Sequence, residues 1–191
     1  MDYKGDIYYI EQVLEGKINA FSYIVDQHKN KAFNLAFRIC GNHEEAEELA
    51  QDSFLKAYRA LRSFKMKSSF ATWFYRIVYN TTISHVRLKR KGVLSLEDFP
   101  ADATDFIGTN TSEEEAEKEY RNSLVNFALQ KITEEERGLI SLYYYEEMST
   151  DEIADVTGIS KSNIKVKLFR ARQKMQEIIE KTEKKKLIYH E

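Results

Sequence analysis

Three carboxylates on one predicted helix have a spacing that would allow them to bind a metal ion. Glu45, Glu48 and Asp52 stand at i, i+3 and i+7, so they share one helical face, as the ligands of a metal ion would. A carboxylate-bridged di-iron bundle would also need Glu-x-x-His pairs on partner helices, and the sequence has none. The four histidines are scattered without ligand spacing, and the single Cys40 cannot build a zinc knuckle or a disulfide framework. We therefore expect neither a metal site nor a cofactor.

Other enzymatic chemistry finds equally little support in the sequence. The seven glycines form neither a P-loop nor a dinucleotide-binding fingerprint. No nucleophile is accompanied by a recognisable base and an orienting group. An enzyme built on a helical bundle stays open as an alternative, which hydrolytic or metal-dependent activity would support. The pattern favours a protein that is not an enzyme.

Clustered lysines and arginines suggest a different chemistry, the binding of phosphates. The net charge is only −2, but the charges lie in blocks. No acidic residue occurs between Asp52 and Glu97, where the ten cations are Lys56, Arg59, Arg62, Lys65, Lys67, Arg76, Arg87, Lys89, Arg90 and Lys91. A second stretch without acids holds Lys161, Lys165, Lys167, Arg170, Arg172 and Lys174. Two such basic surfaces are typical of nucleic-acid binding.

The elements that carry these charges are predicted to be helices throughout. The 191 residues include seven glycines and one proline, and apolar residues recur at helical spacing, so we expect an all-α protein. Residues 93–118, which contain Pro100 and many acids, read as an acidic flexible linker between helical domains at 1–92 and 119–191. No segment has the length and apolar character of a membrane span or a signal peptide, so we expect a cytoplasmic protein that is not inserted in a membrane.

Two helices before residue 62 are expected to build the first domain. One ends at Gly41, and Asn42 caps the next, "EEAEELAQDSFLKAYRAL". Its large apolar residues, Leu49, Phe54, Leu55, Tyr58 and Leu61, are predicted to form the buried side.

The stretch "SFATWFYRIVYNTTISHVRLKRK" is predicted to be a helix with two unlike faces. Its core face should hold Phe70, Phe74, Ile77, Thr81, Ser84 and Leu88. Tyr75 and Tyr79 lie opposite, where their rings suit either packing under another helix or stacking on bases. The basic end of the helix favours the second interpretation, in which the tyrosine rings stack on bases. The preceding loop, with Arg62, Lys65, Lys67, Ser68 and Ser69, is of a kind that can hold an unpaired base.

The last domain contains a predicted helix-turn-helix. Capping boxes Thr133-x-x-Glu136 and Ser149-x-x-Glu152 begin two helices, Gly158 makes the turn, and Ser160 caps the second helix of the motif. The buried stripe of that helix should be Ile164, Leu168, Ala171 and Met175. Its outward residues, Ser162, Asn163, Val166, Arg170 and Gln173 with flanking lysines, are types that contact bases and phosphates.

In the order and separation of these motifs, the chain resembles a bacterial sigma factor of the extracytoplasmic-function (ECF) group, within the primary-sigma superfamily, over about Ile7 to Glu180. The resemblance rests on "EEAEELAQDSFLKAYRAL", the tyrosine-containing helix quoted above, and "EERGLISLYYYEEMSTDEIADVTGISKSNIKVKLFRARQKM". It implies an alternative sigma factor without catalytic residues, which binds core RNA polymerase, recognises −35 and −10 promoter elements and helps to open the DNA.

The resemblance also implies a role for particular residues. Contact with the clamp of the largest polymerase subunit would fall to Glu48, Leu49, Gln51, Asp52 and Phe54. Contact with the −10 region would fall to Arg62, Lys65, Lys67, Ser68, Ser69, Tyr75, Arg76, Tyr79, Asn80, Arg87, Lys89 and Arg90. Contact with the −35 region would fall to Ser160, Lys161, Ser162, Asn163, Lys165, Val166, Lys167 and Arg170. Members of the group are often held inactive by an anti-sigma factor, so such a partner is expected too.

Two departures from the family pattern qualify these expectations. Glu147 stands where a glycine is usual, so the first helix of the last domain's motif is expected to end differently. Ser162 and Asn163 replace a commoner Gly-Thr pair, so specificity for the upstream element cannot be copied from relatives. An alternative to the sigma factor is a stand-alone helix-turn-helix regulator. Such a protein would have no role for the acidic helix that Asn42 caps or for the basic loop before Phe70.

Overall fold

All regular elements that the structure describes are helices. The structure is a computed structural model that describes residues 3–92 and 113–188. The first of these ranges, here called the N-terminal half, contains α1 Tyr3–Leu14, η1 Ile18–Ala20, α2 Phe21–Cys40, α3 His43–Ala60, η2 Leu61–Ser63 and α4 Phe70–Gly92. The second, the C-terminal half, contains α5 Glu113–Lys131, α6 Glu134–Ile140, the short π-helix η3 Ser141–Tyr145, α7 Thr150–Thr157 and α8 Lys161–Ile188. The predicted all-α fold is confirmed.

Local signals in the sequence determine where α2 and α3 end and begin. Gly41 closes α2 with φ 77°, the left-handed conformation that a glycine adopts without a steric penalty. The Asn42 side chain then accepts a hydrogen bond of 2.9 Å from the backbone N–H of Glu45, which satisfies one of the free donors of the first turn of α3. Both predicted signals are therefore present in the structure.

A stripe of small residues forms the buried face of α3. The buried residues are Ala46, Leu49, Ala50, Ser53, Phe54 and Ala57, which lets α3 lie close against α2 and α4. Leu55 is 55 % exposed and Tyr58 37 % exposed, so their predicted burial was wrong. Leu49 and Phe54 are buried as predicted, and small residues that the prediction left out complete the buried face.

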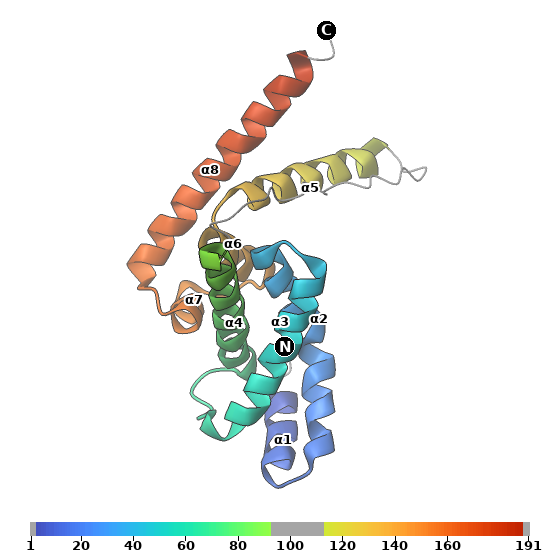
Figure 1. Cartoon of the computed structure of the whole chain (residues 1–191), viewed down its shortest axis with the longest axis vertical. Helices are drawn as coiled ribbons and strands as arrows, with labels where there is room; N and C mark the ends of the chain where they lie inside the picture. Colours follow the sequence, from blue (N-terminus) through green and yellow to red (C-terminus); the bar gives the residue numbers. More distant parts are fainter. Residues whose placement is uncertain (1–2, 93–112, 189–191) are drawn as a thin grey trace.

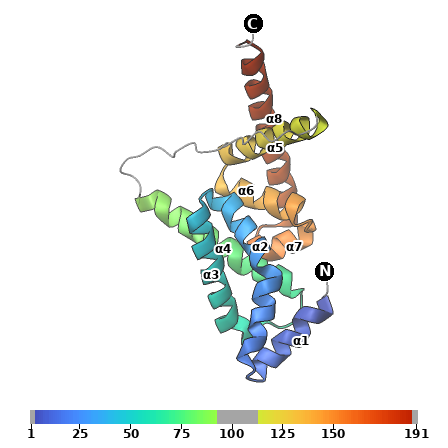
Figure 2. The same ribbon diagram turned by 90° about the vertical axis from the view of Figure 1, so that its right-hand side faces the viewer.

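Helix α4 is the central element of the fold. Phe70 and Phe74 are almost fully buried and pack as stacked rings, with Phe54 of α3 against Phe74. Toward its end α4 projects beyond α2 and α3 (Figure 2), and Leu88 is 69 % exposed there. The prediction of Leu88 in the core was therefore wrong, because the apolar pattern of α4 continues into the part of the helix that projects beyond α2 and α3.

Two confirmed capping boxes begin α6 and α7. Thr133 with Glu136 and Ser149 with Glu152 exchange the reciprocal hydrogen bonds that the sequence predicted. Helix α5 begins at Glu113, inside the segment that the sequence assigned to the linker, whose residues 93–112 lie outside the described ranges.

The two halves pack directly on one another. Helix α4 lies between α2 and α3 on one side and α6 and α7 on the other, and one cluster of buried residues runs through both halves. Figures 1 and 2 show α5 and α8 extending away from this shared core, α8 toward the C-terminus. Within the described ranges, no helix is both long enough and apolar enough to cross a membrane.

Candidate nucleic-acid interface

A groove between α3 and α4 gathers the polar and aromatic groups that nucleic acids require. This α3–α4 groove encloses about 440 Å³ and is lined by Lys56, Ala60, Ser63, Trp73, Arg76, Ile77, Asn80, Thr81 and Ser84. Lys56 extends across it from α3, donating a hydrogen bond of 3.2 Å to the Thr81 hydroxyl of α4. The combination of cations, an amide, hydroxyls and an indole ring suits a sugar-phosphate backbone and an unstacked base.

Of the predicted residues on α4, the structure brings Arg76 and Asn80 into the α3–α4 groove. Both side chains are exposed. Lys56, Trp73 and Ser84 line the same groove and were missed by the sequence reasoning. In the sequence analysis Lys56 counted only as a charge and Ser84 as a core residue, because residues on two different helices give no local signal that they share a groove.

The loop before α4 presents three of its predicted residues to solvent. Arg62, Lys65 and Lys67 are exposed. Ser69 has a structural role, since its hydroxyl accepts a hydrogen bond of 3.0 Å from the Thr72 backbone N–H and lies 2.8 Å from the Thr72 hydroxyl. Ser68 is half-buried. The loop therefore offers its cations to a ligand, while Ser69 begins the helix.

Tyr75 and Tyr79 lie on the other side of α4, away from the α3–α4 groove. They are 3 % and 4 % exposed and are covered by the C-terminal half, the packing under another helix that the sequence also allowed. Burial and a hydrogen bond donated to Glu146 hold the pKa of Tyr75 far above its usual range, and burial raises the pKa of Tyr79 to about 12. Both phenols are neutral, and neither faces solvent in this conformation.

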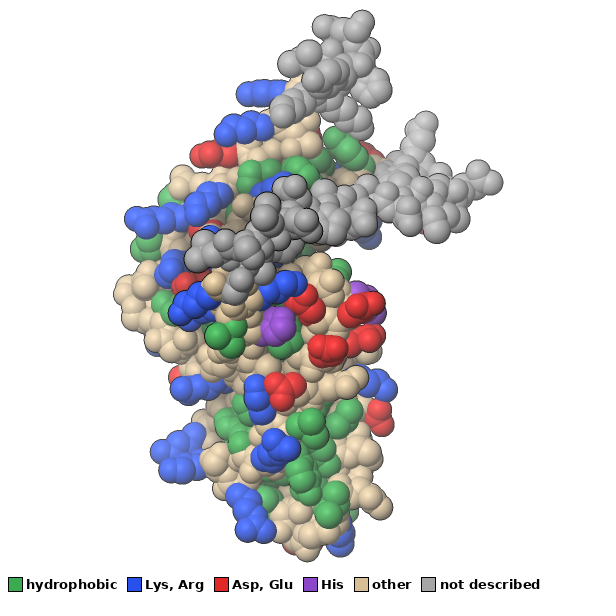
Figure 3. All heavy atoms as spheres, in the orientation of Figure 1, with side chains coloured by type: hydrophobic (Ala, Val, Ile, Leu, Met, Phe, Trp, Pro, Cys, Tyr) green, Lys and Arg blue, Asp and Glu red, His purple; other side chains and the backbone are tan. Residues whose placement is uncertain are grey.

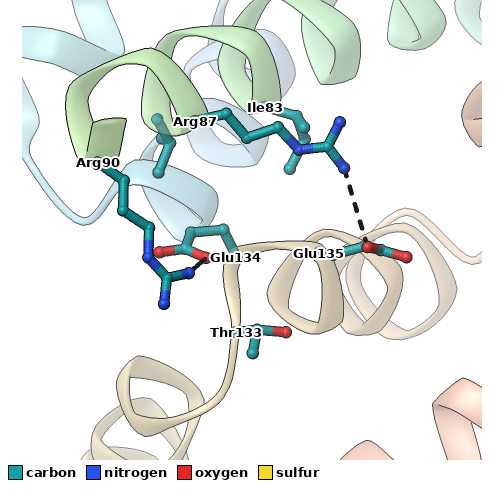
Figure 4. A pocket seen from close by; sticks show the side chains of 7 residues that line it. Ile83, Arg87, Arg90, Thr133, Glu134 and Glu135 are labelled. Carbon is teal, nitrogen blue, oxygen red and sulfur yellow. Dashed lines mark ion pairs between the residues drawn. The ribbon is translucent and has the colours of Figure 1, made fainter. Parts of the chain in front are cut away.

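The basic end of α4 is engaged by carboxylates. Lys89 and His85 both contact Glu45 at the start of α3. Partial burial alone would raise the pKa of Glu45, but these two hydrogen bonds outweigh it and hold that pKa below its usual range. Figure 4 shows Arg87 and Arg90 directed toward Glu135 and Glu134 of α6, at 4.0 and 3.9 Å.

The turn and the buried stripe of the helix-turn-helix are as the sequence predicted. Gly158 adopts φ 74°, and the Ser160 carbonyl accepts the first hydrogen bond of α8, from the Ile164 backbone N–H at 2.9 Å. The predicted stripe of Ile164, Leu168, Ala171 and Met175 is buried. Exposed along the outer side lie Ser160, Lys161, Ser162, Asn163, Lys165, Val166, Phe169 and Arg170, of which Phe169, 54 % exposed, was not predicted.

Two cations of α8 already have acidic partners. Lys161 pairs with Asp151 of α7, and the Lys167 ammonium lies 2.9 Å from Glu135 of α6. The half-buried Lys167 is thus held within the C-terminal half. Arg170 and Lys165 are exposed cations of this helix face, and within residues 3–92 and 113–188 neither forms an ion pair.

The outer face of α3 combines acids with apolar groups. Glu48 and Gln51 are exposed, and Asp52 is half exposed with its carboxylate 2.8 Å from the Lys56 ammonium. Leu49 and Phe54 point into the core, 6 % and 8 % exposed, so they support this face from beneath. In Figure 3 acidic side chains gather near the middle of the visible face and hydrophobic ones below them. Leu55 and Tyr58 add exposed apolar surface next to the acids.

No carboxylate, histidine or cysteine cluster in the described ranges resembles a metal site. The structure shows no group of three such residues close enough to share an ion there. His28, which the sequence treated as a core or boundary residue, is buried and lies 3.1 Å from both carboxylate oxygens of Asp6. Asp6 and His28 join α1 to α2.

Comparison with known protein families matches both halves of the chain. Residues 24–92 match Sigma-70 region 2, and residues 124–175 match Sigma-70 region 4. The ECF RNA polymerase sigma factor SigW of Bacillus subtilis is 32 % identical over 180 residues, which cover 87 % of this chain and 92 % of SigW. The RNA polymerase sigma-H factor of Pseudomonas aeruginosa is 28 % identical over 90 % of this chain and 92 % of that protein.

Solved structures share the fold. CnrH in complex with the cytosolic domain of CnrY superposes with a TM-score of 0.66 at 23 % identity, over 92 % of this chain and 97 % of CnrH. The sigma factor RpoE in complex with the anti-sigma factor NepR from Bartonella quintana gives a TM-score of 0.65 at 22 % identity, over 84 % of this chain and 96 % of RpoE. The family matches in both halves and the 32 % identity to SigW show that the chain belongs to the ECF sigma factors, alternative sigma factors that direct promoter-specific transcription initiation.

Proposed function

We propose that this sigma factor divides promoter recognition between the α3–α4 groove and the outer face of α8, and binds core RNA polymerase through the outer face of α3. The observation that carries the proposal is the α3–α4 groove, a single site where Lys56, Arg76, Asn80 and Trp73 converge. A stand-alone helix-turn-helix regulator needs only the C-terminal half and would have no use for this groove.

The α3–α4 groove suits one strand of an opened −10 element. Exposed Arg76 can neutralise a phosphate, while the Asn80 amide can donate to and accept from a base edge. Trp73 is half-buried at the wall and offers part of its ring as a stacking surface. The exposed cations Arg62, Lys65 and Lys67 of the adjoining loop would extend the contact along the backbone.

The N-terminal part of α8 suits the major groove of the −35 element. Its exposed residues combine a possible phosphate contact, Lys165, with Asn163 and Arg170, which can read base edges. Val166 and Phe169 are 45 % and 54 % exposed, as apolar side chains that contact thymine methyl groups would be. The C-terminal half would thus supply duplex recognition.

The outer face of α3 is proposed to dock on the clamp of the largest polymerase subunit. Glu48, Gln51 and Asp52 supply the polar contacts and Leu55 and Tyr58 the apolar ones. Leu49 and Phe54 contribute by holding the helix in place from the core. We further propose that the protein acts in the cytoplasm, where promoters and polymerase meet, and that an anti-sigma factor regulates it, as the NepR complex illustrates for its relative RpoE.

Run-off transcription with variants of the α3–α4 groove tests this division of labour. Arg76→Ala and Asn80→Ala are each expected to lower transcription about tenfold, since one lost contact of roughly 1.4 kcal/mol has that effect. Affinity for core polymerase should not change, because neither residue lies on the docking face. Glu177→Gln, on an exposed part of α8, is the matched control. Unchanged transcription by both groove variants would refute the proposed −10 site.

A further inference from the structure

Two lysines of α8 stand at the border between its buried stripe and its outer face. Lys167 directly precedes Leu168, and Lys174 directly precedes Met175, so each lysine is next to a residue of the stripe. The two lysines are seven positions apart, which places them on one side of the helix about two turns from each other. Lys165 is exposed, whereas Lys167 is half-buried. Lys167 and Lys174 therefore face the body of the C-terminal half.

Consecutive carboxylates in the first turn of α6 receive these two lysines. The Glu135 carboxylate lies 2.9 Å from Lys167 Nζ, and the Glu136 carboxylate accepts a hydrogen bond from Lys174. The Glu135 and Lys167 side chains are 32 % and 34 % exposed, so water screens this pair less than it screens a fully exposed one. The two ion pairs join successive turns of α8 to α6.

These ion pairs bear on the rotation of α8 about its own axis. Apolar contacts are non-directional, so a buried stripe fixes that rotation less sharply than hydrogen-bonded ion pairs, which require particular positions of donor and acceptor. Successive helical residues differ in direction by about 100°, so rotation by a fraction of that angle would turn Asn163 and Arg170 away from the base edges. The ion pairs with α6 therefore control the direction in which the outer face points.

We propose that Glu135 and Lys167 are positioning residues for −35 recognition: their ion pair fixes the rotation of α8, which directs Arg170 and its neighbours on the outer face to the bases. Lys167 then makes no phosphate contact of its own, although the family resemblance assigned it to the −35 region. This inference rests on the proposed function of the outer face of α8. If Lys167 instead bound a phosphate, Glu135 would compete with DNA for it, so the two roles predict opposite effects of removing the Glu135 charge.

The neighbouring Glu134 provides a matched control for Glu135. It stands in the same turn of α6 and carries the same charge, but it is directed toward Arg90 of α4 at 3.9 Å (Figure 4) and lies 3.7 Å from Arg137. Glu135 also lies 4.0 Å from Arg87 of α4. Glu134→Gln and Glu135→Gln therefore make the same change in net charge and each remove one contact with α4, but only Glu135→Gln removes the ion pair with α8.

Binding of the full chain, assembled with core RNA polymerase, to promoters with intact and altered −35 elements tests the positioning role. Glu135→Gln and Lys167→Gln are each expected to lower the affinity for the intact promoter about threefold, as loss of a partly exposed ion pair does, and to reduce discrimination against the altered elements. The double variant should be no weaker than either single variant, because both act through one pair. Glu134→Gln should discriminate as wild type does. Circular dichroism checks that each variant is folded.

The salt dependence of the same binding separates positioning from direct contact. Loss of one phosphate contact lowers the slope of log affinity against log salt concentration by about one, whereas Lys167→Gln is expected to leave the slope unchanged. A lower slope for Lys167→Gln, or tighter binding by Glu135→Gln than by Glu134→Gln, would overturn the positioning role. Wild-type discrimination in the folded Glu135→Gln and Lys167→Gln variants would overturn it as well. Absence of discrimination by the wild-type protein would instead refute the proposed −35 site, and the positioning role with it.

Discussion

Glu147 occupies a backbone conformation that suits glycine. Its φ is 52°, in the left-handed region, directly after the π-helix η3 and the buried Glu146. The glycine usual in the family at this position would adopt that conformation without a steric cost. The chain thus retains the left-handed turn although it lacks the usual residue.

Replacing Glu147 with glycine is expected to stabilise the protein by about 0.5 to 1 kcal/mol. A non-glycine residue in this region costs about 1–2 kcal/mol, and the extra freedom of glycine in the unfolded chain offsets part of the gain. Urea denaturation measures the change. Glu119→Gly on the exposed surface of α5 is the control and should lose about 1 kcal/mol. A loss of stability in Glu147→Gly would show that the side chain contributes more than the strain costs.

Glu136 makes the stability of the C-terminal half depend on pH. Partial burial would raise its pKa, but the Lys174 ammonium and the Thr133 backbone and hydroxyl hold it below the ordinary 4.5. Because the pKa is lower in the folded than in the unfolded chain, the ionised carboxylate stabilises the fold above about pH 4.5. This contribution is lost as the pH falls through the folded value.

Thermal unfolding of Glu136→Gln between pH 6 and pH 3 checks this assignment. Glutamine can still cap α6 but carries no titrating charge, so the variant should be less stable than wild type at pH 6 by roughly 0.5 to 1 kcal/mol. The difference should shrink toward pH 3. An equal difference at both pH values would show that the carboxylate charge is not responsible.

At the scale of elements, α3 separates a docking face from a structural face. Gln51→Ala combined with Asp52→Ala is expected to weaken binding to core polymerase about tenfold and to change the free energy of unfolding by less than about 0.5 kcal/mol, since both side chains reach solvent. Phe54→Ala should instead destabilise the fold by about 3–5 kcal/mol. Titration of labelled protein with polymerase, beside urea denaturation, measures both effects. A folded double variant with unchanged polymerase affinity would refute the docking face.

On α8, Arg170 is predicted to read the upstream element. Arg170→Ala should reduce transcription from promoters with an intact −35 element by about tenfold and should flatten the difference between −35 variants, as loss of one base contact does. Lys181→Ala, farther along the same helix, is the control. The same ranking of −35 variants by wild type and Arg170→Ala would exclude this role.

The elements themselves were largely predictable from sequence, because their signals are local. Asn42, Gly158 and the two capping boxes act within four residues of their partners and are found where the sequence places them. The exposure of single side chains was less predictable. Leu55 and Leu88 follow the helical pattern of their neighbours, but among the described helices none covers either side chain.

At the scale of the whole molecule, the packing of the two halves had no signal in the sequence. Tyr75 and Glu146 are 71 residues apart, and no spacing rule connects them. A helical wheel placed Tyr75 and Tyr79 on the face of α4 opposite Phe70 and Phe74, yet it could not decide whether that face packs against another helix or contacts nucleic acid. In the structure both tyrosines belong to the buried core that the two halves share. The α3–α4 groove was likewise only half predicted, since Lys56 and Trp73 join it through the angle between two helices.

The most direct test of the central claim combines purified protein with bacterial core RNA polymerase, first in a pull-down and then in run-off transcription on a library of genomic promoters. We predict that the protein binds polymerase and initiates at a subset of promoters that share two elements, and that Asn80→Ala and Arg170→Ala each reduce use of one of them. Binding to duplex DNA without any association with polymerase would contradict this claim and would indicate a stand-alone regulator.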